Sequence, residues 1–292
     1  MTMQALIILA IKISIVLTVF ALGLRSTTTD MTYLFRNREK LARSMLSMFV
    51  VMPVFALAVA AFTNVPQPVK VALVILSVGP VPPLLPRRAS KADGADDYAV
   101  GLLFSAALIA IVFVPLIIAI IGWLFGLHAR APVSTVASVM LLTVLVPLIA
   151  GVVAHRLWPD LAERLSGPLS TFAFVLLIVS VLPVLYKAMP MSIALAHDGS
   201  VLAYIGFTVL GLVAGHFLGG PEPENRSTLA IATCARHPAL AIAIAGANFP
   251  NPKDAVAAVG LYMLVSILVC VPYSIWRRRQ HEDTGSAHAP AA

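Results

Sequence analysis

Charged residues are scarce in this chain. Asp, Glu, Lys and Arg make up 11% of its 292 residues, whereas hydrophobic residues make up 60%. Soluble globular domains carry about 25% charged residues, so the composition excludes an ordinary soluble protein. A run of about 20 apolar residues can cross a bilayer as a helix, and such runs recur along the chain. The sequence therefore predicts an all-α protein that crosses the membrane many times.

Cysteine and acidic residues are scarce as well. The two cysteines, Cys234 and Cys270, both fall in apolar segments, which excludes a disulfide framework and favours packing roles. All thirteen carboxylates fall in loops, at segment ends or in the C-terminal tail. A membrane enzyme needs clustered acids, a metal motif or a nucleophile with a base inside the bilayer, and the sequence contains none of these. We therefore expect no catalytic residue, no metal and no cofactor.

Nine apolar segments are long enough to span the bilayer. They are residues 4–24, 41–62, 67–86, 97–125, 133–155, 165–188, 199–218, 227–248 and 254–276. The loops between them are short, so no soluble domain is inserted. The sequence thus predicts one transmembrane domain over residues 1–278 and a polar, disordered cytoplasmic tail over residues 279–292.

Basic residues alternate with the loops and predict the orientation. Fourteen fall on one side of the predicted spans: Arg25, Arg36, Arg38, Lys40, Arg43, Arg87, Arg88, Lys91, Arg156, Arg164, Arg226, Arg277, Arg278 and Arg279. Four fall on the other side: Lys70, Arg130, Lys187 and Lys253. Cytoplasmic loops are enriched in Lys and Arg, so we expect an external N-terminus and a cytoplasmic C-terminus in the plasma (inner) membrane. The alternation also argues against a nucleic-acid-binding patch as the source of the net charge of +7.

The span over residues 227–248 is interrupted by a cation and a proline. A charge near the bilayer centre costs about 2.5 to more than 10 kcal/mol, so Arg236 is expected to face the bundle interior or a wet cavity. Pro238 has no N–H, so the carbonyl of Cys234 loses its helical partner, and the proline ring disfavours helical geometry at His237. The helix is therefore predicted to break here.

The span over residues 67–86 is predicted to break too, because Pro80, Pro82, Pro83 and Pro86 follow Ser77 and Gly79. The two broken spans lie five spans apart, and an odd offset gives them opposite orientations. We therefore expect an inverted-topology repeat, in which spans 1–4 recur as spans 6–9 and span 5 connects them. Two broken helices that cross near the midplane are typical of alternating-access transporters.

Six stretches, taken together, resemble the bile acid:sodium symporter family. They are ALGLRSTTTDMTYLFRN (21–37), MPVFALAVA (52–60), SVGPVPP (77–83), KADGADDYAVGLLFS (91–105), VPLIAGVVAHR (146–156) and NRSTLAIATCARHPALAIAIAG (225–246). The resemblance covers nearly the whole chain and matches the nine-helix form of the family. It implies a core domain of spans 2–4 and 7–9, and a panel domain of spans 1, 5 and 6.

The chain departs from that family where sodium would bind. The family typically has Glu-Thr-Gly-x-Gln-Asn at the second break, whereas this chain has Ala232-Thr233-Cys234-Ala235-Arg236-His237. The family typically has Pro-Gly-Gly followed by Ser-Asn at the first break, whereas this chain has Pro80-Val81-Pro82 followed by Leu85-Pro86. The acid and amide ligands are replaced, and Arg236 would repel a cation. These departures argue against the family's sodium coupling.

What remains at the breaks suits an anion. The half-helix that starts at Pro238 offers free N–H groups, and Arg236 adds a charged fork of donors. His237 either donates a hydrogen bond or carries a proton, or it is a buried neutral imidazole; Arg236 is alternatively a strut bonded to neighbouring carbonyls. The candidate substrate-binding residues are Ser77, Pro80, Thr233, Arg236, His237 and Pro238.

The sequence thus predicts a secondary transporter of small organic anions in the lipid bilayer, working by alternating access. It leaves the coupling ion, H⁺ or Na⁺, open. Two other functions are also considered: a non-transporting membrane sensor or scaffold, and a membrane enzyme acting on lipid-like substrates.

Overall fold

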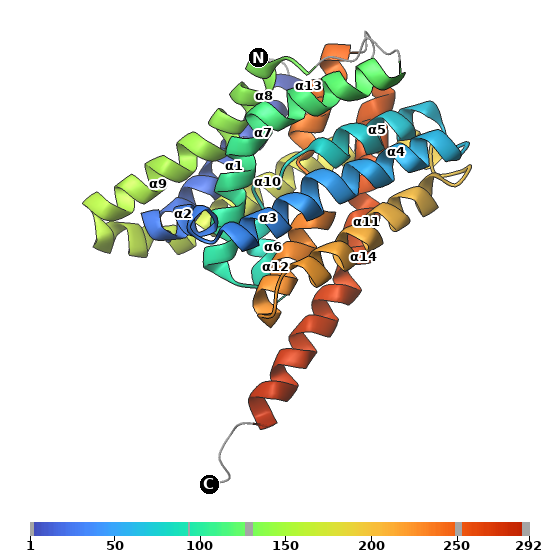
Figure 1. Ribbon diagram of the computed structural model, residues 1–292. Helices are drawn as coiled ribbons and strands as arrows, with labels where there is room; N and C mark the ends of the chain where they lie inside the picture. The colour runs from blue at the N-terminus through green and yellow to red at the C-terminus, as the bar shows by residue number, and fades with distance from the viewer. Residues whose placement is uncertain (1–2, 93, 126–130, 249–252, 288–292) are drawn as a thin grey trace.

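The computed structural model describes residues 3–92, 94–125, 131–248 and 253–287. Every regular element within these ranges is a helix (Figure 1). Eight helical stretches among them are long and apolar enough to cross a membrane. The protein is therefore an all-α membrane protein, as predicted.

The eight stretches include two that contain a π-helical turn and one that is interrupted. They are α1 (Met3–Gly23), α3 with η1 and α4 (Arg38–Leu46, Ser47–Val51, Met52–Phe62), α7 (Asp96–Phe125), α8 with η2 and α9 (Val133–Met140, Leu141–Leu145, Val146–Leu157), α10 (Pro159–Ala194), α11 (Ser200–Leu218), α12 with α13 (Pro223–Cys234, Pro238–Asn248) and α14 (Lys253–Ala287). A short helix, α2 (Thr28–Arg36), follows α1 and starts with a capping box formed by Thr27 and Asp30.

The predicted span over residues 67–86 forms two short helices instead of one long one. α5 covers Gln67–Val78 and α6 covers Leu85–Ser90, and residues 79–84 between them are not helical. Each proline in this run lacks an N–H and restricts the residue before it, so the helix ends ahead of the first proline. The predicted count of nine spans is therefore not confirmed: the described residues contain eight candidate spans and this broken element.

The last helix continues further than the sequence suggests. α14 reaches Ala287, so residues 279–287 are helical where we expected a disordered tail, and residues 288–292 lie outside the described ranges. No proline interrupts the chain between Pro272 and residue 287, and each further residue adds one hydrogen bond to an existing helix. Figure 1 shows this end of α14 projecting away from the bundle.

The helices form two packed groups. α1 packs against α9 and α10, and we call α1, α8, η2, α9 and α10 the panel. In the second group, α11 packs against α12 and α14, and α5 packs against α4 and α14; we call α3–α7 and α11–α14, with η1, the core. The two groups correspond to the panel and core domains that the family resemblance implies.

Small residues let the backbones of the core approach closely. Gly211 and Gly215 lie one turn apart on α11 and face α12. A Cβ at Gly211 would lie 2.7 Å from the Cα of Cys234, and one at Gly215 would lie 2.5 Å from the Cα of Ala230. No side chain fits there, so glycines at this spacing bring α11 and α12 together, as in other membrane helix pairs.

Basic residues gather at one end of the bundle, which we call the basic end. There the Nζ of Lys40 lies 3.3 Å from a carboxylate oxygen of Glu222, and the Nη2 of Arg277 donates to the carbonyl of Pro223 at 2.9 Å. On the panel, the Nε of Arg25 donates to Ser166 near the start of α10 at 3.0 Å. These contacts join residues from the loops that the alternation of charges assigns to one side.

Candidate functional site

The two helix breaks meet inside the core. The backbone N–H of His237, in the second break, donates to the carbonyl of Pro80, in the first break, at 3.1 Å. The Nη1 of Arg236 donates to the neighbouring carbonyl of Gly79, also at 3.1 Å. The broken helices therefore cross and are bonded to each other at the crossing, as the sequence predicts.

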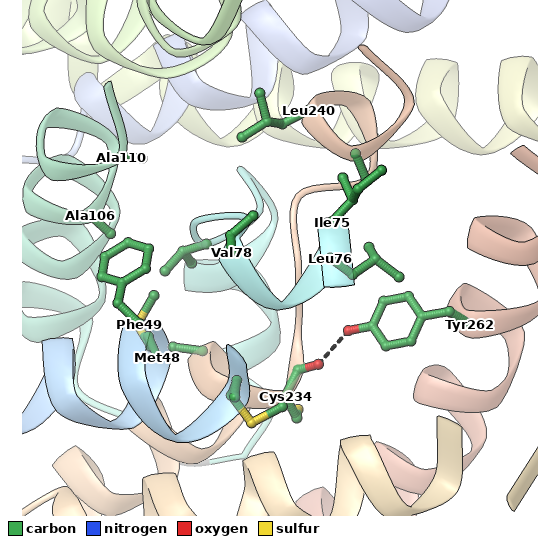
Figure 2. Packing of buried hydrophobic residues seen from close by; sticks show 14 of the residues in the cluster. Met48, Phe49, Ile75, Leu76, Val78, Ala106, Ala110, Cys234, Leu240 and Tyr262 are labelled. Carbon is green, nitrogen blue, oxygen red and sulfur yellow. Dashed lines mark hydrogen bonds between the residues drawn. The ribbon is translucent and has the colours of Figure 1, made fainter. Parts of the chain in front are cut away.

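The carbonyl that Pro238 deprives of a helical partner finds another donor. The hydroxyl of Tyr262 on α14 donates to the carbonyl of Cys234, where α12 ends (Figure 2). Tyr262 is 1% exposed, so this bond lies in the core beyond the reach of bulk water. A buried carbonyl without a partner costs about 1–3 kcal/mol, which makes Tyr262 part of what holds the break open.

Arg236 is bound by backbone oxygens. Besides Gly79, its guanidinium donates through Nη2 to the carbonyl of Met48 at 3.3 Å, and its side chain is 3% exposed. Met48 lies in the π-helical turn η1, and such turns change which carbonyls are free to accept outside bonds. Within the described ranges, the Nε of Arg236 has no partner and no carboxylate forms an ion pair with the guanidinium. This geometry matches the alternative in which Arg236 is a strut between neighbouring segments.

His237 also has bonds on both sides of its ring. Its Nδ1 accepts from the backbone N–H of Leu240 at 3.3 Å, so the proton of the neutral ring lies on Nε2. That Nε2 faces the hydroxyl of Thr143 at 3.4 Å, and Thr143 itself donates to the carbonyl of Val139 at 2.6 Å. The arrangement matches the buried neutral imidazole, and it connects the crossing to η2 of the panel.

The two remaining polar candidates are bonded within the core. Ser77 donates to the carbonyl of Val74 at 2.7 Å, and the hydroxyls of Thr233 and Ser47 lie 2.8 Å apart. Ser77 and Thr233 are both 0% exposed. The structure therefore brings all six predicted residues together at the crossing, where five are buried and Pro238 is half-buried.

A cavity of about 710 Å³ lies elsewhere, at the basic end between the panel and the core. It is lined by Thr18, Ala21 and Leu22 from α1, by Arg25, Ser26, Asp30, Pro83, Pro86, Arg87, Ser90, Lys91, Asp96, Asp97 and Val100, and by Gly167, Ser170 and Thr171 from α10. None of the six predicted residues is among them. The cavity touches the first break through Pro83 and the start of α6 through Pro86. Its volume is within the range of pockets that bind small molecules.

The cavity holds three cations that the sequence analysis used only for topology: Arg25, Arg87 and Lys91. Along the described chain, none of them lies within ion-pair distance of a carboxylate. Two of the three nearby carboxylates are engaged locally: Asp30 accepts from the N–H of Thr27, and Asp97 accepts from the N–H of Tyr98. No sequence signal distinguishes these cations from loop cations, because only the packing of α1 and α10 against the core makes them line a cavity.

Near the opposite end of the core–panel boundary, the panel and the core are hydrogen-bonded to each other. The hydroxyl of Ser192, near the C-terminal end of α10, donates to the carbonyl of Ala257 on α14 at 3.0 Å. Ser192 is 2% exposed. The boundary between panel and core thus contains a buried hydrogen bond near one end and a cavity at the basic end.

A comparison with known protein families identifies the family of this chain. The model described as the Sodium Bile acid symporter family matches residues 12–191, more than half of the chain. The chain belongs to this family. The matched residues include the first break and every residue that lines the cavity, whereas the second break lies outside them. The description of the family names symporters, which are membrane transporters.

Two curated relatives match the chain, and both are called P3 protein. The one from Bos taurus is 27% identical over 220 residues, which cover 72% of this chain and 45% of the relative. The one from Mus musculus is 26% identical over 190 residues, which cover 63% of this chain and 39% of the relative. The chain spans less than half the length of either relative, and the name P3 protein specifies no substrate.

Proposed function

We propose that this protein is a secondary transporter of small amphipathic organic anions that works by alternating access. It lies in the plasma (inner) membrane with its N-terminus outside and its basic end in the cytoplasm. The observation that carries the proposal is the cavity between core and panel, where, among the described residues, Arg25, Arg87 and Lys91 lie beyond ion-pair distance of any carboxylate.

The lining of the cavity suits an anion with an apolar body. Guanidinium and ammonium groups attract carboxylates, sulfonates and sulfates, and Arg binds such groups through two parallel hydrogen bonds. Leu22, Val100, Pro83 and Pro86 offer apolar surface in the same cavity. Bile acids have this combination of an apolar body and one acidic group, so they are suitable first probes.

The asymmetry of the core–panel boundary supports alternating access. In this conformation the cavity lies at the basic end, while the Ser192 bond to Ala257 joins panel and core near the other end. Exposure of the cavity to the outside would require the panel to move against the core and break that bond. The structure thus corresponds, in this proposal, to the state that faces the cytoplasm.

Sodium-independent transport is part of the proposal. The carbonyls of Gly79 and Met48 at the crossing are occupied by the guanidinium of Arg236. A sodium ion needs oxygen ligands, and an arginine charge 4 Å away opposes it by about 4 kcal/mol at an effective dielectric constant of about 20. The positive charge at the crossing is therefore that of Arg236, a residue of the chain itself.

Uptake into proteoliposomes tests this function. Purified protein should take up radiolabelled taurocholate saturably above empty liposomes, and the rate should be the same in sodium and in choline media. Absence of uptake, with binding retained, would favour a non-transporting sensor. A tenfold stimulation by sodium, about 1.4 kcal/mol of coupling, would show that a sodium site exists elsewhere in the chain.

A further inference from the structure

Arg87 differs from the other cations of the cavity in the way it is held. Its guanidinium lies over the ring of Phe174, with 3.8 Å between its Cζ and the ring centroid. Arg87 belongs to α6 of the core, directly after the first break, and Phe174 belongs to α10 of the panel. The contact therefore joins the two domains across the wall of the cavity.

Stacking of this kind leaves the hydrogen-bond donors of the guanidinium free. A cation over an aromatic face uses the flat side of the group, whereas its five N–H donors point outward in its plane. Within the part of the chain that the structure describes, no acceptor binds these donors. Arg25 and Arg236, in contrast, donate to Ser166 and to backbone carbonyls.

The stacked pair lies at the inner end of the cavity. α10 begins at the basic end, and Thr171 is the last of its residues in the cavity lining. Phe174 follows three residues later, about one helical turn further from the basic end. An anion that enters from the basic end would therefore meet the free donors of Arg87, which is half-buried between the domains.

We propose that Arg87 and Phe174 together form the anion receptor of the cavity. Arg87 binds the carboxylate or sulfonate of an amphipathic organic anion, and Phe174 holds the guanidinium plane in position. Because the two residues belong to different domains, the receptor is complete only while core and panel are aligned as they are here. Anion affinity is thereby coupled to the movement of the panel. This inference rests on the proposed transport function.

Binding of radiolabelled taurocholate to the purified protein in nanodiscs, below micellar concentrations, tests the receptor. Arg87→Gln should weaken binding about 10- to 100-fold, the worth of a charge-assisted pair. Arg87→Lys should restore part of the loss, because a point charge lacks the fork. Phe174→Leu should weaken binding about 3- to 10-fold, and Phe174→Tyr, which keeps an aromatic face, should bind as the wild type does.

Matched controls exist on the same helices. Arg88→Gln makes the same charge change one residue later on α6, at a position that does not line the cavity. Phe172→Leu makes the same change on α10, at a side chain that is 58% exposed. Both should bind taurocholate as the wild type does, and melting temperatures of all variants identify any that fail to fold.

A protein that carries both Arg87→Gln and Phe174→Leu tests whether the two residues act together or independently. If Phe174 acts by holding Arg87, then Phe174→Leu should cause no further loss of affinity in the Arg87→Gln protein. Additive losses, or wild-type affinity in a stable Arg87→Gln protein, would contradict the pair while leaving the transport function intact. A wild-type protein that neither binds nor takes up taurocholate or cholate would contradict the proposed function, and the receptor with it.

Discussion

Replacement of Arg236 by Gln is the most informative change at the crossing. The Arg236 side chain bonds the carbonyls of Gly79 and Met48 and so connects the first break, the second break and η1. A hydrogen bond from a charged group contributes about 1.5–3 kcal/mol, and a buried carbonyl left without a donor costs about 1–3 kcal/mol. A shorter Gln reaches at most one of the two carbonyls. It also removes a buried charge whose Nε has no partner among the described residues, which offsets part of the loss.

We expect Arg236→Gln to destabilise the protein by about 2–4 kcal/mol. For a chain of this size that lowers the melting temperature by about 5 °C or more. Arg36→Gln serves as the control, because Arg36 is exposed and surface changes of this kind stay within about 0.5 kcal/mol. The folded fraction should bind taurocholate within about threefold of wild type, since Arg236 does not line the cavity.

Thermal melting and anion affinity, measured on the same preparations, decide between the two roles of Arg236. A stable Arg236→Gln protein that has lost anion affinity would refute the strut. That result would support the sequence-based prediction that Arg236 is the counter-ion of the substrate. Lower stability with normal affinity would instead assign Arg236 to the architecture of the crossing.

Three further predictions concern the core, the boundary and the topology. Tyr262→Phe should lower the melting temperature, because the carbonyl at the end of α12 loses its donor at a cost of about 1–3 kcal/mol; an unchanged melting curve would contradict this. Cysteines that replace Ser192 and Ala257, joined by a short bifunctional thiol reagent, should stop taurocholate uptake but preserve its binding. Full transport after complete cross-linking would show that this end need not open. An impermeant thiol reagent on intact cells should label a cysteine at Gln67 but not one at Asn37, and the reverse pattern would invert the topology.

Local chemistry was enough to predict much of the fold. Apolar runs mark the membrane helices because a bilayer demands about 20 such residues in sequence. Prolines mark the breaks because a residue without an N–H cannot continue the hydrogen-bond ladder, and α5 and α12 do end before Pro80 and Pro238. The prediction that residues 67–86 form a full span was not confirmed. These residues are apolar enough for a span, but their prolines keep each of the two helices shorter than the bilayer requires.

Tertiary structure alone decided what the polar residues contact. Arg236 bonds carbonyls 157 and 188 residues earlier in the chain, and no local pattern specifies which backbone oxygens packing brings within reach. The π-helical turns η1 and η2 were likewise not visible in the sequence, although they supply Met48 and Thr143 to the crossing.

The candidate site was likewise predicted in part from the sequence and in part visible only in the tertiary structure. The sequence alone identified the crossing, because a cation and prolines in apolar segments are conspicuous there. It could not identify the cavity, because Arg87 and Lys91 look like any other loop cations in a chain whose loops on one side are basic. They line a cavity only because α1 and α10 of the panel pack opposite α6 and α7 of the core. The composition and order of the residues determined the class of protein and its breaks, whereas the position of one domain against the other determined where an anion could bind.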